Sequence, residues 1–341
     1  MVGQQSNERK NIRDREKMKE RRKAFEIRTD LALEVRENAL KNSKEISGVS
    51  VHEWSEKTGI CKITEVKVLD QDGSKKMGKP VGTYLTLEAE DIKGRKQEER
   101  DRIAEILGQE IYRLLKEQGI ENGSHILVVG LGNESVTPDA LGPRTLSHLI
   151  ISGHLEEKEQ KKMFGDGCFL SALTPGVMAQ TGMETAKILQ GVVKETKPDA
   201  ILVIDALAAR SVRRLGNTIQ LSDTGIHPGS GVGNHRQAID KDTFGIPVLA
   251  LGIPTVVGAA AVAQDTLGAL IEVLERENVT KHIGEYLKQL DTQEQYEWIR
   301  EILAFEFGSM YVTEPDIDET IRQLALLLSD GIHRAVYPRI K

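Results

Sequence analysis

The chain has few cysteines, few aromatic residues and no long apolar run. Its 341 residues include two cysteines, Cys61 and Cys168, and aromatic side chains make up 4% of the total. Two cysteines without metal-ligand spacing form no disulfide framework, which points to a reducing compartment such as the cytoplasm. No apolar run reaches the roughly 18 residues of a membrane span. Residues 1–23 are too polar for a secretory signal.

Several catalytic signatures are also missing. No G-x-S-x-G motif occurs, so we expect no hydrolase-type serine nucleophile. Residues 130–133 (GLGN) do not complete G-x-G-x-x-G and are a weak phosphate-binding signal. Residues 223–225 (DTG) match the tripeptide of pepsin-like aspartic proteases. Those enzymes need two copies in an all-β fold, and this chain has one, so we interpret it as a turn.

Charge is distributed unevenly. The formal net charge is −6, but residues 1–23 hold nine Lys/Arg and four Asp/Glu, a net +5, which leaves −11 for the remainder. A basic segment with few apolar residues cannot bury enough surface to order itself. We interpret residues 1–30 as a basic N-terminal pro-segment, and a solvated tail is the alternative. The acidic remainder argues against direct contact with nucleic acid.

Apolar strands alternate with amphipathic helices through the middle of the chain. The strands are predicted at 126–129, 169–173, 201–204 and 248–253, and the helices at 100–118, 142–151, 181–194 and 257–274. This alternation predicts an α/β fold, a mostly parallel sheet with helices on both faces. We expect residues 31–341 to form a single domain. Its residues 280–341 are predicted to be a C-terminal helical appendage, with helices near 293–307 and 317–328.

Two carboxylates follow predicted strands. Asp205 ends the strand 201–204, and Asp139 lies in the loop after 126–129. Ligands of open α/β sheets bind beyond the carboxyl ends of the strands. Two close carboxylates share one proton and thereby supply both a base for water and an acid for a leaving amine. The alternative is that either Asp caps a helix or binds a ribose or Mg²⁺.

Two further residues are candidate auxiliaries. His227 lies in the glycine-rich stretch 225–234, where it is a base, a ligand or an ordinary loop residue. Asn133 belongs to the turn that precedes Asp139. One histidine beside two aspartates is weak evidence for zinc, so we predict no metal site.

The sequence resembles the germination proteases of spore-forming bacteria. The motifs that carry the resemblance run from about Arg28 into the C-terminal helices: YLTLEA (84–89), GLGN (130–133), VTPDALGP (136–143), PGVM (175–178), IDALAAR (204–210), SDTGIHPGSGVGN (222–234) and GIPTVV (252–257). Glu134 departs from the aromatic residue expected there, and the basic extension is longer than the family's short pro-segment.

The resemblance implies an atypical aspartic endopeptidase in which Asp139 and Asp205 are the essential carboxylates. It implies a homotetrameric zymogen of the forespore or spore core that cleaves small acid-soluble, DNA-binding spore proteins during germination, without a membrane or nucleic-acid partner. It also implies a hydrogenase-maturation-protease-like fold. No cofactor is expected, although acidic residues at equivalent places hold a metal in those maturation proteases, which leaves metal assistance open.

The resemblance also implies a self-cleavage site. Family substrates are cut after an acidic residue or Thr and before an apolar residue, followed by Ala, any residue and Glu. Residues 30–34 (DLALE) have this form, so we predict cleavage between Asp30 and Leu31. An ordinary helix start with Asp30 as N-cap is the compatible alternative.

Two other hydrolases remain as alternatives. A metal-dependent maturation-type protease would use the same carboxylates with a metal ion. A peptidyl-tRNA hydrolase-like enzyme has a similar glycine-asparagine turn, but it would continue with Pro-Gly and an early His. Here Glu134 and Ser135 follow, and the next histidine is His148.

Overall fold

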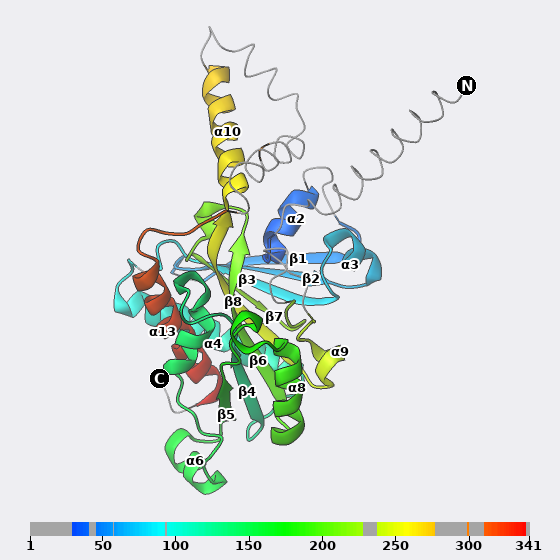
Figure 1. Cartoon of the computed structure of the whole chain (residues 1–341), viewed down its shortest axis with the longest axis vertical. Coiled ribbons are helices and arrows are strands. Elements are labelled where there is room, and N and C mark those ends of the chain that lie inside the picture. The colour runs from blue at the N-terminus through cyan, green and yellow to red at the C-terminus, as the bar shows by residue number, and fades with distance from the viewer. Residues whose placement is uncertain are drawn as a thin grey trace, which may run out of the picture. The chain divides into compact units, whose positions relative to one another are not determined.

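The computed structural model describes residues 29–40, 46–56, 58–92, 94–227, 237–276, 299 and 310–338. The chain divides into two compact units. One comprises Thr29–Gly258 and Tyr311–Lys341 and contains the sheet. The other comprises Met1–Arg28 and Ala259–Met310, and its described helix is α10 (Ala259–Arg276). None of the described helices is long and apolar enough to cross a bilayer. Figure 1 shows the whole chain.

The described strands form one nine-stranded sheet in the order β1-β2-β3-β7-β8-β6-β4-β5, and β9 pairs with β8. Their bounds are β1 Val49–Ser55, β2 Lys62–Val68, β3 Gly82–Glu88, β4 His125–Gly130, β5 Phe169–Leu173, β6 Ala200–Ala209, β7 Thr218–Ser222, β8 Val248–Gly258 and β9 Tyr311–Val312. The helices are α2 Ala32–Leu40, α3 Gln71–Met77, α4 Gln97–Glu117, α5 Leu141–Ser147, α6 Glu157–Phe164, α7 Met178–Thr181, α8 Thr185–Thr196, α9 Lys241–Phe244 and α13 Ile317–Val336, with 3-10 turns η1 Thr137–Asp139 and η2 Val212–Arg214.

The α/β class is confirmed, but the prediction of a mostly parallel sheet is wrong. Among the described strands, only the pairs β4–β5, β4–β6 and β6–β8 are parallel. The run β1-β2-β3-β7-β8 and the pair β8–β9 are antiparallel. Parallel neighbours need a long crossover, usually a helix. Residues 56–61 between β1 and β2 are too few for such a crossover, so these two strands form a hairpin. The pattern of alternating strands and helices did not predict this antiparallel half of the sheet.

Helices cover both faces of the sheet, as predicted. Alternate residues of a strand point to opposite faces. In β6, Leu202 and Ile204 join the core that contains α4 and α13, while Ile201 and Val203 join the smaller core that contains Leu189 of α8. Figure 1 shows α4 and α13 on one side of these strands and α8 on the other. By the same alternation, Asp205 points to the α8 face.

The α8 face continues across the antiparallel half of the sheet. There α2 and α3 pack on β2 and β3 through a separate cluster that contains Ala32, Val66, Val68, Met77 and Tyr84. The candidate site lies on this face, beyond the carboxyl end of β4 and beside the C-terminal half of β6.

Candidate active site

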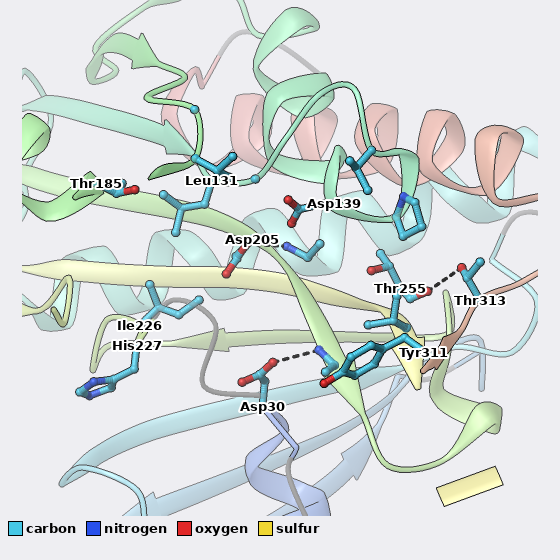
Figure 2. Close-up of a pocket in the computed structure, with 18 residues that line it drawn as sticks. Asp30, Leu131, Asp139, Thr185, Asp205, Ile226, His227, Thr255, Tyr311 and Thr313 are labelled. Carbon is cyan, nitrogen blue, oxygen red and sulfur yellow. Dashed lines mark hydrogen bonds between the residues drawn. The ribbon is translucent and has the colours of Figure 1, made fainter. Parts of the chain in front are cut away.

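A pocket of about 470 Å³ opens beyond the carboxyl end of β4, beside the C-terminal halves of β6 and β8. Its titratable lining residues are Asp30, Asp139, Asp205, His227 and Tyr311. Figure 2 shows the carboxylates of Asp139 and Asp205 close together. Asp30 lies beside the later part of β6, where it binds Ala208. The structure therefore brings both predicted carboxylates and the residue before the predicted cleavage bond to one cavity.

Asp139 is held by the turn that follows β4. The backbone N–H of Asn133 donates to Asp139 Oδ2 at 2.8 Å, and the Asp139 N–H donates to the Val136 carbonyl at 2.8 Å. Gly132 has φ +111°, and a Cβ there would lie 1.9 Å from the Asp139 carbonyl oxygen. The turn therefore requires glycine at this position, which explains the second glycine of residues 130–133.

Asp205 lies inside β6, which continues to Ala209, so the prediction that this residue ends a strand is wrong. It is paired with Gly252 in the β6–β8 ladder, and the Ala206 N–H donates to its Oδ1 at 2.9 Å. Both Asp139 and Asp205 are half-buried. Each carboxylate accepts a backbone N–H and still borders the cavity, an arrangement that can hold a water molecule and exchange protons with it.

The predicted cleavage segment is docked against the same cavity. The Asp30 N–H donates to the Ala208 carbonyl at 3.0 Å, and the Ala208 N–H donates back to Asp30 Oδ2 at 2.9 Å. The side chains of Leu31 and Ala32 are fully buried. Asp30 is thus fixed to β6 three residues after Asp205, with the Asp30–Leu31 bond beside the pocket.

Two side chains that the sequence did not single out bind the carbonyl of Asp30. Lys79 Nζ donates to it at 2.9 Å and Gln220 Nε2 at 3.0 Å. Gln220 Oε1 also accepts the Ala32 N–H at 2.7 Å. No recognised motif includes Lys79 or Gln220, because their role depends on strands far apart in the sequence.

Glu34, the last residue of the predicted cleavage motif, occupies a polar socket. It is 3% exposed, and its carboxylate accepts the N–H groups of Arg210 at 2.8 Å and Ser211 at 3.1 Å. The hydroxyl of Thr29 donates to it, and Arg214 Nε lies 3.4 Å away. Burial raises the pKa of Glu34, opposed by these hydrogen bonds and by the charge of Arg214.

The auxiliary candidates differ in their placement. Asn133 supports the turn: its Oδ1 accepts the Ser135 N–H at 3.0 Å and Gln180 Nε2 at 2.7 Å. His227 lines the pocket, but it is exposed, and Figure 2 shows its ring pointing away from Asp139 and Asp205. Residues 228–236 of its loop lie outside the described residues. Among the described side chains, no three His, Cys, Asp or Glu gather as a metal site requires.

The DTG tripeptide lies outside this cavity's lining. Asp223 follows β7, and its Oδ1 accepts the Thr83 N–H from β3 at 2.7 Å. Burial raises the pKa of Asp223. Its carboxylate therefore joins two strands at their ends, in keeping with the interpretation as a turn.

Comparison with known proteins finds a matching family model and relatives that share its description. The family model described as germination protease matches residues 24–285, more than half of the chain. A germination protease of Caldanaerobacter subterraneus subsp. tengcongensis is 46% identical over 92% of this chain and 94% of its own length. Those of Clostridium tetani and Priestia megaterium are 40% and 38% identical, over 92% and 93% of this chain and 97% and 95% of their own lengths.

Proposed function

Because the chain belongs to the germination protease family and is therefore a peptidase, we propose that it is a self-processing endopeptidase in which Asp139 and Asp205 activate water. The observation that carries the proposal is the pocket itself. One cavity is lined by both carboxylates and by Asp30, the residue before the predicted cleavage bond.

In this mechanism the two carboxylates share one proton. The ionised carboxylate removes a proton from water, and the protonated one later protonates the leaving amine. Asp139 is oriented by Asn133 and Asp205 by Ala206, so each keeps a fixed position relative to the bond. Fixed groups accelerate reactions because orientation is settled before the chemical step.

We propose that residues 1–30 are a pro-segment and that the Asp30–Leu31 bond is cut within the precursor. Residues 31–341 then form the mature protease. Docking of Asp30 on Ala208 and burial of Leu31 support this, because they hold the bond beside the pocket. The precursor is thus a zymogen of the aspartic type.

The self-cleavage proposal is tested by intact mass against time at mildly acidic pH. We expect wild type to lose residues 1–30, while Asp139→Asn and Asp205→Asn remain intact and folded. Asp223→Asn is the matched control, since its Oδ1 can still accept the Thr83 N–H, and we expect it to be processed normally. Normal processing of Asp205→Asn would remove that residue from the mechanism.

For the biological role, we propose small acid-soluble, DNA-binding spore proteins as substrates and the spore core as the site of action, in line with the relatives' shared name. We also propose a homotetramer and a likeness of the parallel core β4-β5-β6-β8 to hydrogenase maturation proteases. Native mass spectrometry should give four times the chain mass. Processed enzyme should cut a purified substrate after an acidic residue or Thr, and cleavage after basic residues would contradict the substrate assignment.

A further inference from the structure

The carbonyl oxygen of Asp30 accepts hydrogen bonds from two side chains that come from different parts of the fold. Lys79 lies between α3 and β3, and Gln220 is on β7. Their nitrogen atoms lie 2.9 Å and 3.0 Å from the oxygen. A carbonyl oxygen has two lone pairs, so two donors fill its capacity. This carbonyl belongs to the Asp30–Leu31 bond, which is the bond cleaved in the proposed function.

The sheet register places Gln220 on the same face as Asp205, two strands away. Gln220 and Asp205 are both in register with Gly252, on either side of β8, so their side chains point to the same face. Two strand spacings, roughly 10 Å, separate their Cα atoms. Asp30 spans this interval: its side chain and N–H bind Ala208 on β6, and its carbonyl oxygen is held from the β7 side.

Lys79 brings a cationic group to this oxygen. Burial lowers the pKa of Lys79, while the carboxylates of Asp30 and Glu34 oppose the shift. A donor in a partly desolvated site interacts more strongly with developing negative charge than the same donor in water. Gln220 is within a central strand, and Lys79 lies in the short connection to β3, directly after the C-cap Gly78 of α3.

We propose that Lys79 and Gln220 form the oxyanion-binding group for cleavage of the Asp30–Leu31 bond, and that they act in the same way on a substrate carbonyl. This assignment rests on the proposed function, because it takes that bond as the one cleaved. Both side chains touch the reacting carbonyl, so both are catalytic residues in the proposed reaction.

The proposed step is balanced. The oxygen of one water molecule bonds to the Asp30 carbonyl carbon while a carboxylate of the pair Asp139 and Asp205 takes a water proton. The carbonyl π electrons move onto the oxygen, whose negative charge Lys79 and Gln220 stabilise. When the intermediate collapses, the C–N bond breaks and the Leu31 nitrogen takes a proton from the protonated carboxyl group. One water is consumed, and a carboxylic acid and an amine are produced; transfer of the acid proton to the amine gives a carboxylate and an ammonium group.

The test measures the first-order rate constant for loss of residues 1–30 in the full chain. We expect Lys79→Met to lower it on the order of 100-fold, the usual cost of one oxyanion donor. Lys79→Arg keeps a cationic donor and should retain more activity than Lys79→Met. The matched control is Lys76→Met, because Lys76 is an exposed lysine that pairs with Asp72 away from the site. It should process at the wild-type rate.

Gln220 offers a second comparison that separates catalysis from anchoring. At neutral pH, Gln220→Glu keeps an acceptor for the Ala32 N–H and loses the donor to Asp30, whereas Gln220→Leu loses both bonds. If the bonds only anchor the segment, the Leu variant should be the slower. An oxyanion role predicts that the Glu variant is at least as slow, because its carboxylate repels the developing charge. Thermal unfolding of each variant verifies that it is folded.

The outcomes separate this inference from the proposed function. Wild-type or faster processing in Lys79→Met and Gln220→Glu, with Asp205→Asn inactive, would overturn the oxyanion assignment and leave the proposed function standing. Cleavage of wild type at a different bond would instead contradict the proposed self-cleavage, and with it the assignment of these two donors. Slow processing in both donor variants, with Glu at least as slow as Leu, supports the inference.

Discussion

Arg214 lies against the buried carboxylate of Glu34, with 3.4 Å between Nε and Oε1. The same guanidinium binds Glu37 and Glu88, each at 2.7 Å. Arg214 thus connects α2, which begins just after the predicted cleavage bond, to β3 of the sheet. Its side chain is 12% exposed, so water screens these pairs little.

We expect Arg214→Met to destabilise the fold by about 3 kcal/mol, because removing one partner leaves a buried charge without compensation. Urea denaturation at neutral pH measures the change. Arg213→Met is the control, since Arg213 is exposed, and its midpoint should match wild type. Combining Arg214→Met with Glu34→Gln should cost less than the sum of the two single changes. A wild-type midpoint for Arg214→Met would contradict the buried-pair argument.

A second prediction concerns His333 on α13. This side chain is 5% exposed, and its Nε2 accepts the Ile150 N–H at 2.9 Å. Burial lowers the pKa of His333 to about 4. In the unfolded chain, His333 takes up a proton near pH 6.5, whereas in the folded chain it does so only near pH 4. The stability that the neutral ring contributes is therefore complete above pH 6.5 and is lost as the pH falls toward 4.

The expected loss from this one histidine is roughly 3 kcal/mol, from about 1.4 kcal/mol per pKa unit. Urea midpoints of wild type and His333→Gln, measured from pH 7.5 to 4.5, report it. The glutamine can accept the Ile150 N–H and does not titrate, so its stability should depend less steeply on pH. Parallel curves for the two proteins would show that His333 does not titrate in this way.

A third prediction concerns Gly132. A methyl group there would collide with the Asp139 carbonyl, and the backbone has φ +111°. We expect Gly132→Ala to slow self-cleavage on the order of 100-fold, because small misplacements of a catalytic group have effects of this size. Gly123→Ala is the control, since Gly123 also has a positive φ, +87°, but nothing within 4 Å. Equal activity in the two variants would mean that the turn tolerates the displacement.

A fourth prediction concerns Asp30. Its Oδ2 accepts the Ala208 N–H at 2.9 Å, and a charged acceptor binds an N–H more strongly than a neutral one. Asp30→Asn should therefore slow processing about fivefold, equivalent to about 1 kcal/mol. Asp30→Ala, which loses the bond, should be slower still. Intact-mass kinetics decide the order, and an unchanged rate in Asp30→Ala would contradict a role for this contact.

The sequence predicted the parallel half of the sheet well. The apolar runs of β4 and β6 predicted the strand type and the end of β4 at Gly130, but β6 continues past Asp205 to Ala209, so its end did not follow from local pattern. Asp139 could be placed in the loop after β4 for the same reason. That both side chains meet in one pocket required the pairing of β4 with β6, which was assumed and is observed.

The rest depends on contacts between distant segments. Gln220 reaches Asp30 across 190 positions of the chain, and Arg210 reaches Glu34 across 176. Periodicity carries no information on such pairs. The antiparallel half of the sheet was not predicted for a related reason. Strand β3 pairs with β7, and nothing in the local sequence of residues 82–88 identifies residues 218–222 as their partner.

The burial of Leu31 makes the proposed cut a one-way step. Before cleavage, the Leu31 N–H donates to Thr29 Oγ1 at 3.1 Å. Cleavage would turn this nitrogen into an ammonium group and release Thr29 with the departing fragment. A new positive charge would then lie at a fully buried residue, near Lys79 and without its former acceptor. Such a charge is unfavourable in apolar surroundings, so we expect the new chain end to turn toward water. The uncut geometry could not be regained, and the vacated pocket would be free to receive another chain.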